Sequence, residues 1–508
     1  MKRRTIVFGG ALALTLPRPG RSAISAPDTI HTFHYENVLG TSLQLRVAAV
    51  SRDQARGASD AVLAEIGRQA KILSTWDPRS EVSRWQRTNG RPVRVSPDLF
   101  RVLALYDQWR ARTNGAIDPS AQAITEVWQQ GARENRLPSD EELAAAVAKT
   151  RVSQWTLNHI SGSATRTGET PLVFAAMAKS YIIDRAADAA MHTGVSAAVV
   201  NIGGDIAVRG DHAEVVDIAD PHSSAENGEP VARVMVRNQA IATSGDYRRG
   251  VTINGRRYSH IVDPRTGAPA QDVVSSTVIA SNPADAGALA TAFSVLKPSE
   301  SAQLAASMPG VAYLLVKKNG EQVKNDNWRA YEVAAVTKPA VSRAAFAPAA
   351  TGGLWDPSMG LTIDFEIAHL QGMVRRPFIA AWIEDADRFQ VKTIALWYHE
   401  DRFLTEMKSW YRSDRMRAMA EGKELFKSIG AATRAPGKYS LQWDGKDNAG
   451  NTIKAGKYTA YLEVCREHGT HQMVKKEFDF NGKPDKVSFP ANIELTSASF
   501  DYHKLAGK

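Results

Sequence analysis

The sequence predicts two domains of different fold class: an α/β or α+β domain, followed by an all-β sandwich. The chain has 508 residues, which is too long for one ordinary domain. Segments with helical periodicity alternate with buried strands in residues 27–335, whereas residues 354–508 consist mainly of segments that alternate or run apolar at strand length. A stretch rich in Ala, Pro and Gly at residues 336–353 separates the two patterns, and we expect it to be a linker.

Residues 1–26 are typical of an export signal. Basic residues precede a short apolar run, and small residues suited to cleavage follow at residues 23–26. The run is too short to span a bilayer as a stable helix. The Arg3-Arg4 pair resembles a twin-arginine signal, which exports folded proteins, although other export signals also begin with basic residues. We therefore expect a cleaved signal peptide and a periplasmic mature chain without a membrane span.

Composition and charge narrow the class of function. With 43% hydrophobic and 23% charged residues, the chain resembles an ordinary globular protein. The formal net charge of +9 fits attraction to an anionic ligand or surface. The basic residues are spread along the chain, which argues against nucleic-acid binding. Cys465 is the only cysteine, so no intramolecular disulfide is possible.

The first domain contains several segments with the apolar spacing of helices. The segment at residues 96–113 is the clearest, because Ser96 is a good N-cap, Pro97 suits the first helical position, and Asn114-Gly115 ends the helix. Residues 197–204 read as a buried strand that ends in a glycine turn. The other expected helices are residues 54–74, 140–149, 175–193 and 284–296.

A β-hairpin is expected around Asn254-Gly255, a strong signal for a two-residue turn. The strand after this turn leads into His260, and polar segments at residues 243–246 and 263–267 read as tight turns on either side. This mix of a histidine, acids and bases indicates a ligand site. From the hairpin alone, a hydrogen-bonded histidine within a sheet is equally compatible with the pattern.

The second domain contains strand-like segments and one helical insertion. The expected strands cover residues 361–367, 378–383, 393–398, 437–443 and 458–464, and the insertion covers residues 415–429. The polar stretch at residues 444–451 lacks the Gly at position six and the distal Glu of an EF-hand loop, so we interpret it as a hairpin loop.

A series of short segments in the first domain resembles the ApbE family of FAD:protein FMN transferases. The segments occur in the family's order at residues 38–42, 73–85, 115–119, 178–184, 201–204, 244–247, 260–267 and 288–291. The resemblance implies an exported flavoprotein that uses Mg²⁺, moves the FMN half of FAD to a Thr or Ser of an acceptor protein, and releases AMP. The implied partner is an FMN-acceptor domain of a membrane-linked redox system. The second domain resembles an uncharacterised exported domain that accompanies flavin transferases.

The resemblance also implies roles for individual residues. Phosphoryl-type transfer depends mainly on positioning and charge neutralisation, and His260 is the candidate catalytic residue, either taking the hydroxyl proton or orienting the phosphate. Ala176, Asp285 and Thr291 are the candidate ligands of Mg²⁺, which prefers oxygen. The implied flavin-binding residues are Gly40, Thr41, Ala116, Ile117, Asp118, Lys179, Gly204, Ser244, Gly245, Asp246 and Ile261. Outside the resemblance, Lys179 reads as a solvated lysine, and Asp118 and Gly204 read as turn residues.

The sequence departs from the family pattern at two positions. Gly287 stands where the family places an acid four residues before Thr291, and Val173 replaces a usual Asp. Either the helix begins late enough for Asp285 to reach the metal, or fewer protein groups hold it. The departures leave two alternatives to transfer: an FAD-binding redox or scaffold protein, and an Mg²⁺-dependent FAD pyrophosphatase.

Overall fold

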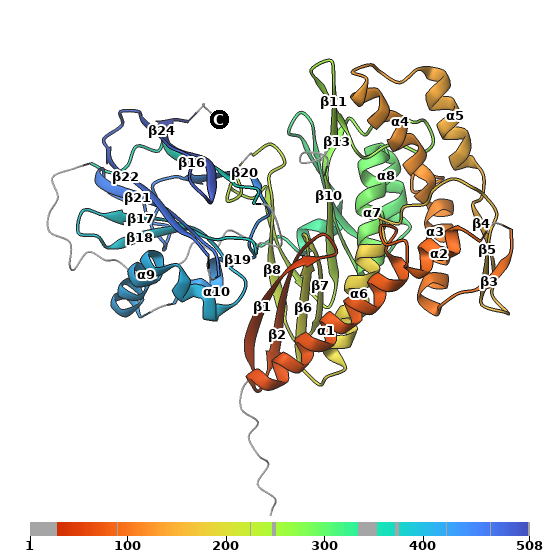
Figure 1. Ribbon diagram of the computed structural model, residues 1–508, viewed down its shortest axis with the longest axis horizontal. Coiled ribbons are helices and arrows are strands. Elements are labelled where there is room, and N and C mark those ends of the chain that lie inside the picture. Colours follow the sequence, from red (N-terminus) through yellow and green to blue (C-terminus); the bar gives the residue numbers. More distant parts are fainter. Residues whose placement is uncertain are drawn as a thin grey trace, which may run out of the picture.

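The chain folds into the two expected domains (Figure 1), and each has a large hydrophobic core of its own. The computed structural model describes residues 28–88, 90–223, 225–245, 250–333, 353–370, 375–422, 424–467 and 469–505. The expected signal peptide, residues 336–352 of the expected linker, and Asp246 lie outside the described residues. Among the helices of the described ranges, none combines the length and the apolar character needed to cross a bilayer.

A sheet with the strand order β1-β2-β6-β7-β10-β13-β14-β15 forms the centre of the first domain. Each neighbouring pair is antiparallel, so the domain is of the α+β type. Both faces of the sheet are covered, which explains why β6 and β7 run apolar instead of alternating. The strands are β1 (Thr29–Val38), β2 (Thr41–Ala49), β6 (Ala197–Ile202), β7 (Asp205–Gly210), β10 (Ala240–Gly245), β13 (Val273–Ala280), β14 (Ala312–Lys317) and β15 (Gln322–Lys324).

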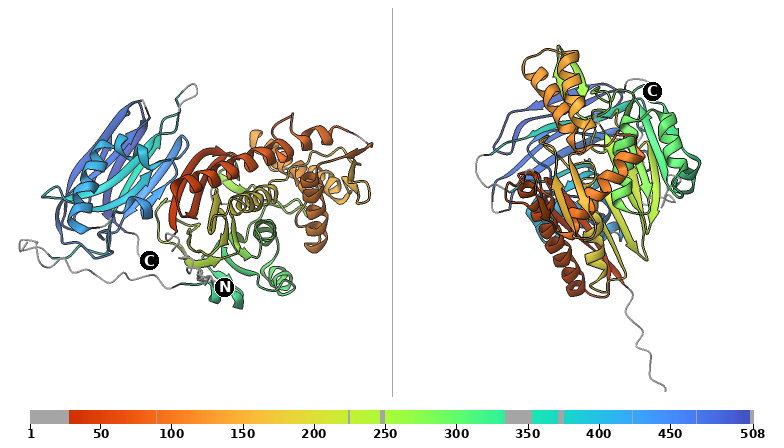
Figure 2. Two further views of the ribbon diagram at one scale, coloured as in Figure 1. Left: turned by 90° about the horizontal axis from the view of Figure 1, so that it is seen from below. Right: turned by 90° about the vertical axis from the view of Figure 1, so that its right-hand side faces the viewer.

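Three helices pack together along one face of this sheet, as Figures 1 and 2 show. The innermost, α7, is buried on almost every side, and its small residues allow close approach to β10, β13 and α6. A hairpin and a 3₁₀ turn around the buried Trp328 cover the opposite face. These elements are α1 (Arg52–Leu73), α6 (Ala178–Met191), α7 (Pro283–Val295) and the adjoining α8 (Pro298–Ala306), with β8 (Ala213–Ile218), β9 (Ala232–Arg237) and η2 (Asp326–Ala330) opposite.

Helix α3 (Pro97–Arg112) has the ends that the sequence predicts. The Ser96 hydroxyl accepts from the Leu99 amide, and Asn114 and Gly115 take positive φ angles of 48° and 82°. Helix α6 instead begins at Ala178, three residues after the expected start, because a turn precedes it. The other elements beside α3 are α2 (Glu81–Gln86), η1 (Pro119–Ala121), α4 (Gln122–Arg133), α5 (Asp140–Arg151) and the small sheet of β3 (Pro92–Arg94), β4 (Trp155–Asn158) and β5 (Ser163–Arg166).

The predicted hairpin consists of β11 (Gly250–Ile253) and β12 (Arg256–Ser259), joined by Asn254 and Gly255. Both turn residues have positive φ, at 50° and 75°, as a two-residue turn of this kind requires. The prediction of a turn at residues 243–246 is wrong for residues 243–245. Thr243 to Gly245 continue β10 because they pair with β13, and the Thr243 and Thr277 hydroxyls lie 2.9 Å apart across the strands.

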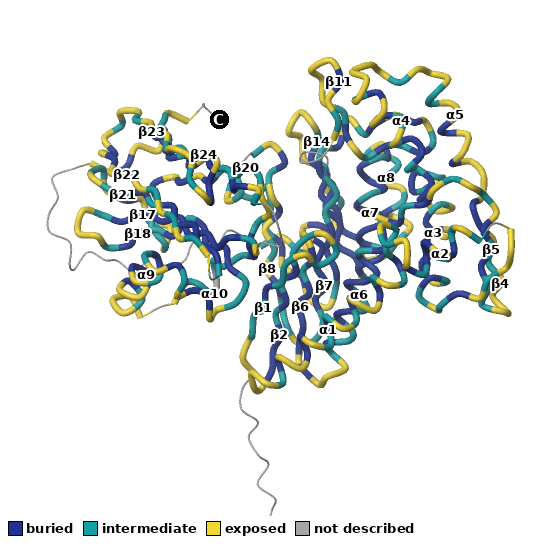
Figure 3. Tube along the Cα trace, viewed as in Figure 1, coloured by how far each residue is buried: buried dark blue, intermediate teal, exposed yellow. Residues whose placement is uncertain are grey.

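The second domain is a β-sandwich, as predicted, and Figure 3 marks long stretches of strands such as β17 and β21 as buried. One sheet has the order β20-β16-β24-β23 and the other β19-β18-β17-β21-β22. Helices α9 (Lys408–Glu421) and α10 (Phe426–Ile429), with η3 (Asp401–Glu406), pack on the outer face of the second sheet. The strands are β16 (Met359–Ile367), β17 (Phe378–Asp385), β18 (Gln390–Trp397), β19 (Gly430–Ala431), β20 (Gly437–Trp443), β21 (Gly456–Cys465), β22 (His471–Phe480), β23 (Asp485–Phe489) and β24 (Leu495–Lys504).

The domains meet where the segment between β8 and β9 runs beside β20. The Glu226 amide donates to the Ser440 carbonyl at 2.9 Å. The Asn227 side chain accepts from the Gln442 amide at 2.8 Å and donates to the Gln442 carbonyl at 2.6 Å. A third contact joins the His34 amide to the His399 carbonyl at 3.2 Å. Main-chain and side-chain hydrogen bonds therefore fix the position of the second domain against β1 and the β8–β9 segment.

Candidate functional site

A cavity of about 870 Å³ opens in the first domain between the start of α6, the end of β10 and the loop after β12. The helices α3, α6 and α7 supply one side, and the β6–β7 turn and β8 supply another. Most of the residues predicted for the site line this cavity. They are Ala116, Ile117, Asp118, Ala176, Lys179, Gly204, Ser244, Gly245, His260, Ile261 and Thr291.

Three predicted residues have other positions. Gly40 lies in the β1–β2 turn and Thr41 begins β2, and both line a second cavity, which shares Gly203 and Gly204 with the first. Asp285 is not among the lining residues of either cavity. It lies in the first turn of α7, where its carboxylate accepts a hydrogen bond from the Asn282 side chain at 2.7 Å. Asp246 is outside the described residues, so its role stays a prediction.

Lys179 supplies a cation at the cavity wall. Its ammonium lies 3.0 Å from Asp205 Oδ2, and the Ser180 hydroxyl donates to the same oxygen at 3.2 Å. The Asp205 side chain is 9% exposed, whereas the Lys179 side chain is 33% exposed. A buried carboxylate that holds the lysine by one end leaves the remaining ammonium hydrogens available to an anion in the cavity.

Asp118 is held by two structural contacts. Its carboxylate pairs with Arg110 at 2.8 Å and accepts from the Ser120 amide at 2.8 Å, which caps η1. Burial raises the pKa of Asp118, and the hydrogen bonds from Ser120 and the charge of Arg110 oppose that shift. This arrangement suits a residue that shapes the turn at the cavity floor.

His260 directly follows β12 and is exposed at the cavity mouth. The loop that continues from it is firmly anchored, because Arg265 binds the Asp263 carboxylate at 2.9 Å and the Trp128 indole donates to the Gly267 carbonyl at 2.9 Å. The Tyr258 ring lies 5.0 Å from the Trp128 ring. A rigid hairpin and an anchored loop therefore present the imidazole to whatever enters the cavity.

Tyr106, on α3, is a lining residue that the sequence reasoning missed. It is 1% exposed, and among the described residues its hydroxyl has no hydrogen-bond partner of good geometry, although the backbone amides of Met177 and Ala176 lie near it. Burial raises its pKa well above the usual range, so the phenol stays protonated. In the sequence it looks like one more apolar position of an amphipathic helix. Only the packing of α3 against the cavity reveals that Tyr106 belongs to its lining.

The residues around Ala176 and Thr291 do not fit the expected magnesium site. Both line the cavity, and the Thr291 and Ser244 hydroxyls lie 3.3 Å apart. A Cβ atom built on Gly287 would stand 3.2 Å from the Ala176 carbonyl oxygen, so position 287 faces this site but supplies no carboxylate. No group of three or more His, Cys, Asp and Glu side chains suited to a metal occurs within the part of the chain that the structure describes. A carbonyl and a hydroxyl form a weak ligand set for Mg²⁺.

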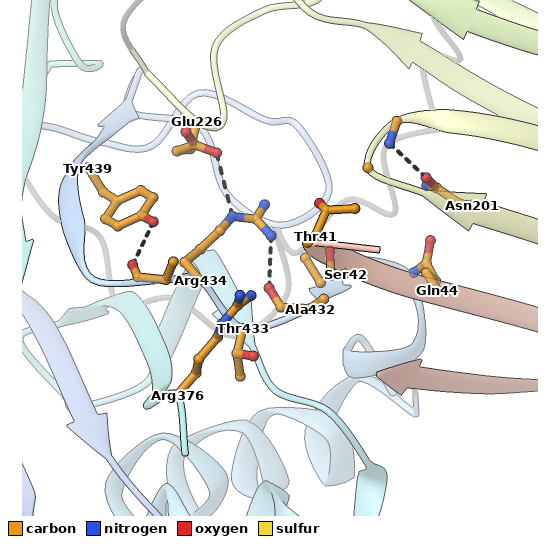
Figure 4. Close-up of a pocket in the computed structure, with 15 residues that line it drawn as sticks. Thr41, Ser42, Gln44, Asn201, Glu226, Arg376, Ala432, Thr433, Arg434 and Tyr439 are labelled. Atoms are coloured by element: carbon orange, nitrogen blue, oxygen red, sulfur yellow. Dashed lines mark hydrogen bonds and ion pairs between the residues drawn. The ribbon is translucent and has the colours of Figure 1, made fainter. Parts of the chain in front are cut away.

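The second cavity, of about 460 Å³, lies between the two domains (Figure 4). Its first-domain wall consists of the β1–β2 and β6–β7 turns with Glu226, and its second-domain wall consists of Arg376, Tyr439 and residues 431–435. We refer to it below as the interdomain cleft.

Comparisons with known proteins agree with this architecture. The profile of the ApbE family matches residues 39–315, which is more than half of the chain, and a profile described as a predicted periplasmic protein (DUF2271) matches residues 360–497. An FAD:protein FMN transferase of Rhodobacter capsulatus is 31% identical over 333 residues, which cover 64% of this chain and 61% of that protein. One of Klebsiella pneumoniae is 28% identical over 326 residues, which cover 62% of this chain and 92% of that protein. The crystal structure of the ApbE protein of Thermotoga maritima superposes with a TM-score of 0.54 at 26% identity and covers 60% of this chain and all of that one. This chain is a member of the ApbE family, joined to a DUF2271 domain.

Proposed function

We propose that this chain is an FAD:protein FMN transferase that acts in the periplasm after removal of residues 1–26. It transfers the FMN half of FAD to a Thr or Ser hydroxyl of an acceptor protein and releases AMP. The acceptor is a flavin-carrying domain of a membrane-linked redox system. Membership of the ApbE family and the similarity to named transferases support the activity.

One observation carries the proposal: a cation, hydroxyl groups and an imidazole from separate elements converge on one cavity. Lys179 comes from α6, Ser244 from β10 and His260 from the loop after β12. The volume of about 870 Å³ lies in the range of cofactor pockets.

The residues suggest how the reaction proceeds. The acceptor hydroxyl oxygen attacks the phosphorus of the FMN half, and the bond from that phosphorus to the bridging oxygen breaks, so that AMP leaves with this oxygen. His260 takes the proton of the attacking hydroxyl. Lys179 balances the negative charge of the pyrophosphate, and the Ser244 hydroxyl contributes a hydrogen bond. Mg²⁺ dependence remains an expectation from the family, and no step here depends on the ion.

Mass spectrometry tests the proposal directly. The mature chain is incubated with FAD, Mg²⁺ and an acceptor domain that a related transferase modifies, beside a His260→Ala variant. We expect an FMN-sized mass gain on the acceptor that the variant loses or forms far more slowly. An unmodified acceptor, under conditions in which the related transferase works, would refute the transferase.

Gly287 and Val173 both stand where the family pattern has an acid, and these departures leave two other functions as alternatives. An FAD-binding redox or scaffold protein would retain intact FAD in the same incubation. An FAD pyrophosphatase would release AMP when no acceptor is present. Chromatography of the nucleotides with and without acceptor distinguishes these two functions from each other and from transfer.

A further inference from the structure

The interdomain cleft is polar on both sides. Thr41, Ser42, Gln44 and Asn201 present hydroxyl and amide groups from the first domain. Arg376 and Arg434 lie next to one another on the second-domain side (Figure 4), with Thr433 close by, whose hydroxyl donates to the Glu36 carboxylate. This lining suits a ligand with main-chain hydrogen-bonding groups and negative charge.

The two arginines are fixed in place by different contacts. Arg434 lies 3.7 Å from the Glu226 carboxylate, donates to the Ala432 carbonyl at 2.8 Å, and stacks on the Trp397 ring. The Arg376 guanidinium donates to Asn37 Oδ1 at 3.0 Å, and that oxygen is uncharged. Glu226 therefore offsets the charge of Arg434, whereas Arg376 forms no ion pair with the acidic residues that the structure describes.

A single hairpin turn separates the interdomain cleft from the cavity of about 870 Å³ in the first domain, where we place FAD. Gly203 and Gly204, between β6 and β7, line both spaces. Their φ angles are +59° and +92°, and a Cβ on Gly203 would stand 2.8 Å from Thr41 Cγ2. A residue with a side chain would collide there, so the turn remains thin. A chain held in the cleft is thus one turn away from the site of transfer.

We propose that the interdomain cleft binds the segment of the acceptor protein that flanks the modified Thr or Ser, and that an acidic side chain of this segment pairs with Arg376. The inference rests on the proposed transferase activity. It gives the second domain a role in acceptor recognition, because that domain supplies both arginines. A protein substrate must reach a cavity occupied by FAD, and the cleft offers a polar, positively charged space beside it.

Kinetics of an Arg376→Gln variant test this inference, with an acceptor domain modified by a related transferase as the probe. Two matched controls are available. Arg375→Gln removes the neighbouring charge, which pairs with Glu467 instead of lining the cleft. Asn37→Gly removes the interdomain hydrogen bond of Arg376 but keeps its charge, and glycine suits the φ of 57° at that position.

We expect Arg376→Gln to raise the KM for the acceptor about tenfold or more, as for the loss of a charged hydrogen bond, with the KM for FAD unchanged. Both controls should resemble the wild type. Neutralising the acidic residues of the acceptor within four positions of the modified residue should weaken the wild type but have little further effect on Arg376→Gln.

Two results would overturn the inference: an unchanged acceptor KM in Arg376→Gln, or an equal rise in Asn37→Gly. A rise in the KM for FAD alone would assign the cleft to the nucleotide. If the wild type transfers no FMN, the proposed function fails, and the Kd of the acceptor for the FAD-loaded wild type and variants, measured by calorimetry, still decides whether Arg376 recognises it.

Discussion

A Cβ atom on Gly287 would overlap the Ser180 hydroxyl, so these two residues share one position in the packing between α6 and α7. The same Cβ would stand 3.0 Å from Ser180 Cβ and 3.2 Å from the Ala176 carbonyl oxygen. Ser180 thus fills the space in which the acid of the family pattern would begin.

This overlap predicts that Gly287→Asp is destabilising alone, by about 1–3 kcal/mol, as an overpacked core substitution. Adding Ser180→Gly removes the overlap and places a carboxylate beside the Ala176 carbonyl and Thr291. We expect the double variant to regain part of the lost stability, because Ser180→Gly also removes the hydrogen bond to Asp205, and to bind Mn²⁺ more tightly than the wild type. Urea unfolding and calorimetry check the two effects, and equal Mn²⁺ affinity in wild type and double variant would contradict the explanation.

Variants of the Lys179–Asp205 pair distinguish an effect on the free energy of unfolding from an effect on FAD affinity. Lys179→Met leaves a buried carboxylate without its cation, so we expect a loss of about 1–3 kcal/mol in unfolding free energy. FAD affinity should fall roughly tenfold or more if the ammonium binds the pyrophosphate. Adding Asp205→Asn should restore stability without restoring affinity. Flavin fluorescence titration and urea unfolding measure both, and recovery of affinity in the double variant would argue against a direct contact.

Tyr106→Phe removes a buried hydroxyl that has no hydrogen-bond partner of good geometry among the described residues. The free energy of unfolding should change little, because only weak contacts with the nearby amides of Met177 and Ala176 are lost. If the hydroxyl binds flavin, FAD affinity should fall by about 0.5–1.5 kcal/mol, which is a factor of roughly two to twelve. Tyr106→Leu, which also removes the ring, is the control for shape. Unchanged FAD affinity in Tyr106→Phe would exclude the hydroxyl as a ligand contact.

Acid should destabilise the contact between the domains. Burial, with the positive charges of Arg46 and His399, lowers the pKa of His34 to about 4 from the ordinary value of 6.5. The unfolded chain therefore binds a proton more readily between these two pH values, and stability falls as the pH decreases through this window. The loss approaches about 3 kcal/mol near pH 4.

Burial also lowers the pKa of His399, which adds to the loss in the same direction. Thermal unfolding from pH 7.5 to 4.5 checks the prediction, with His34→Gln as the variant that cannot take up the proton. A variant with the same pH dependence as the wild type would show that other groups determine it.

Local sequence signals predicted the ends of helices and hairpins correctly where neighbouring residues determine them. The Ser96 cap, the Asn114-Gly115 end of α3 and the Asn254-Gly255 hairpin follow from the preferences of neighbouring residues. The start of α6 was less accurate, because a turn over residues 174–177 continues the same apolar pattern. Of the two alternatives for Asp285, the late start of α7 is not found: the helix begins at Pro283, and the side-chain oxygen of its N-cap Asn282 accepts a hydrogen bond from the Asp285 amide.

The site was predictable only in part. Most of the residues predicted from the ordered motifs line the cavity, including Lys179, Ser244 and His260, but many other lining residues, such as Tyr106, were not predicted. The partners of these residues depend on contacts between distant segments: Ser180 with Gly287, and Lys179 with Asp205. No local pattern in the sequence indicates such pairs. The place of Thr41 depends on a second domain that packs over its turn, and the sequence of the first domain contains no sign of that packing.

The hydrogen bonds of Glu226 and Asn227 to β20 cover an edge strand that would be exposed if the second domain were produced alone. Strand β20 is at the edge of its sheet, and the Asn227 side chain pairs with both main-chain groups of Gln442. An open edge invites pairing with another copy. A fragment with residues 353–508 alone would expose that edge and tend to self-associate. The first domain therefore protects the sandwich from edge-to-edge pairing between copies.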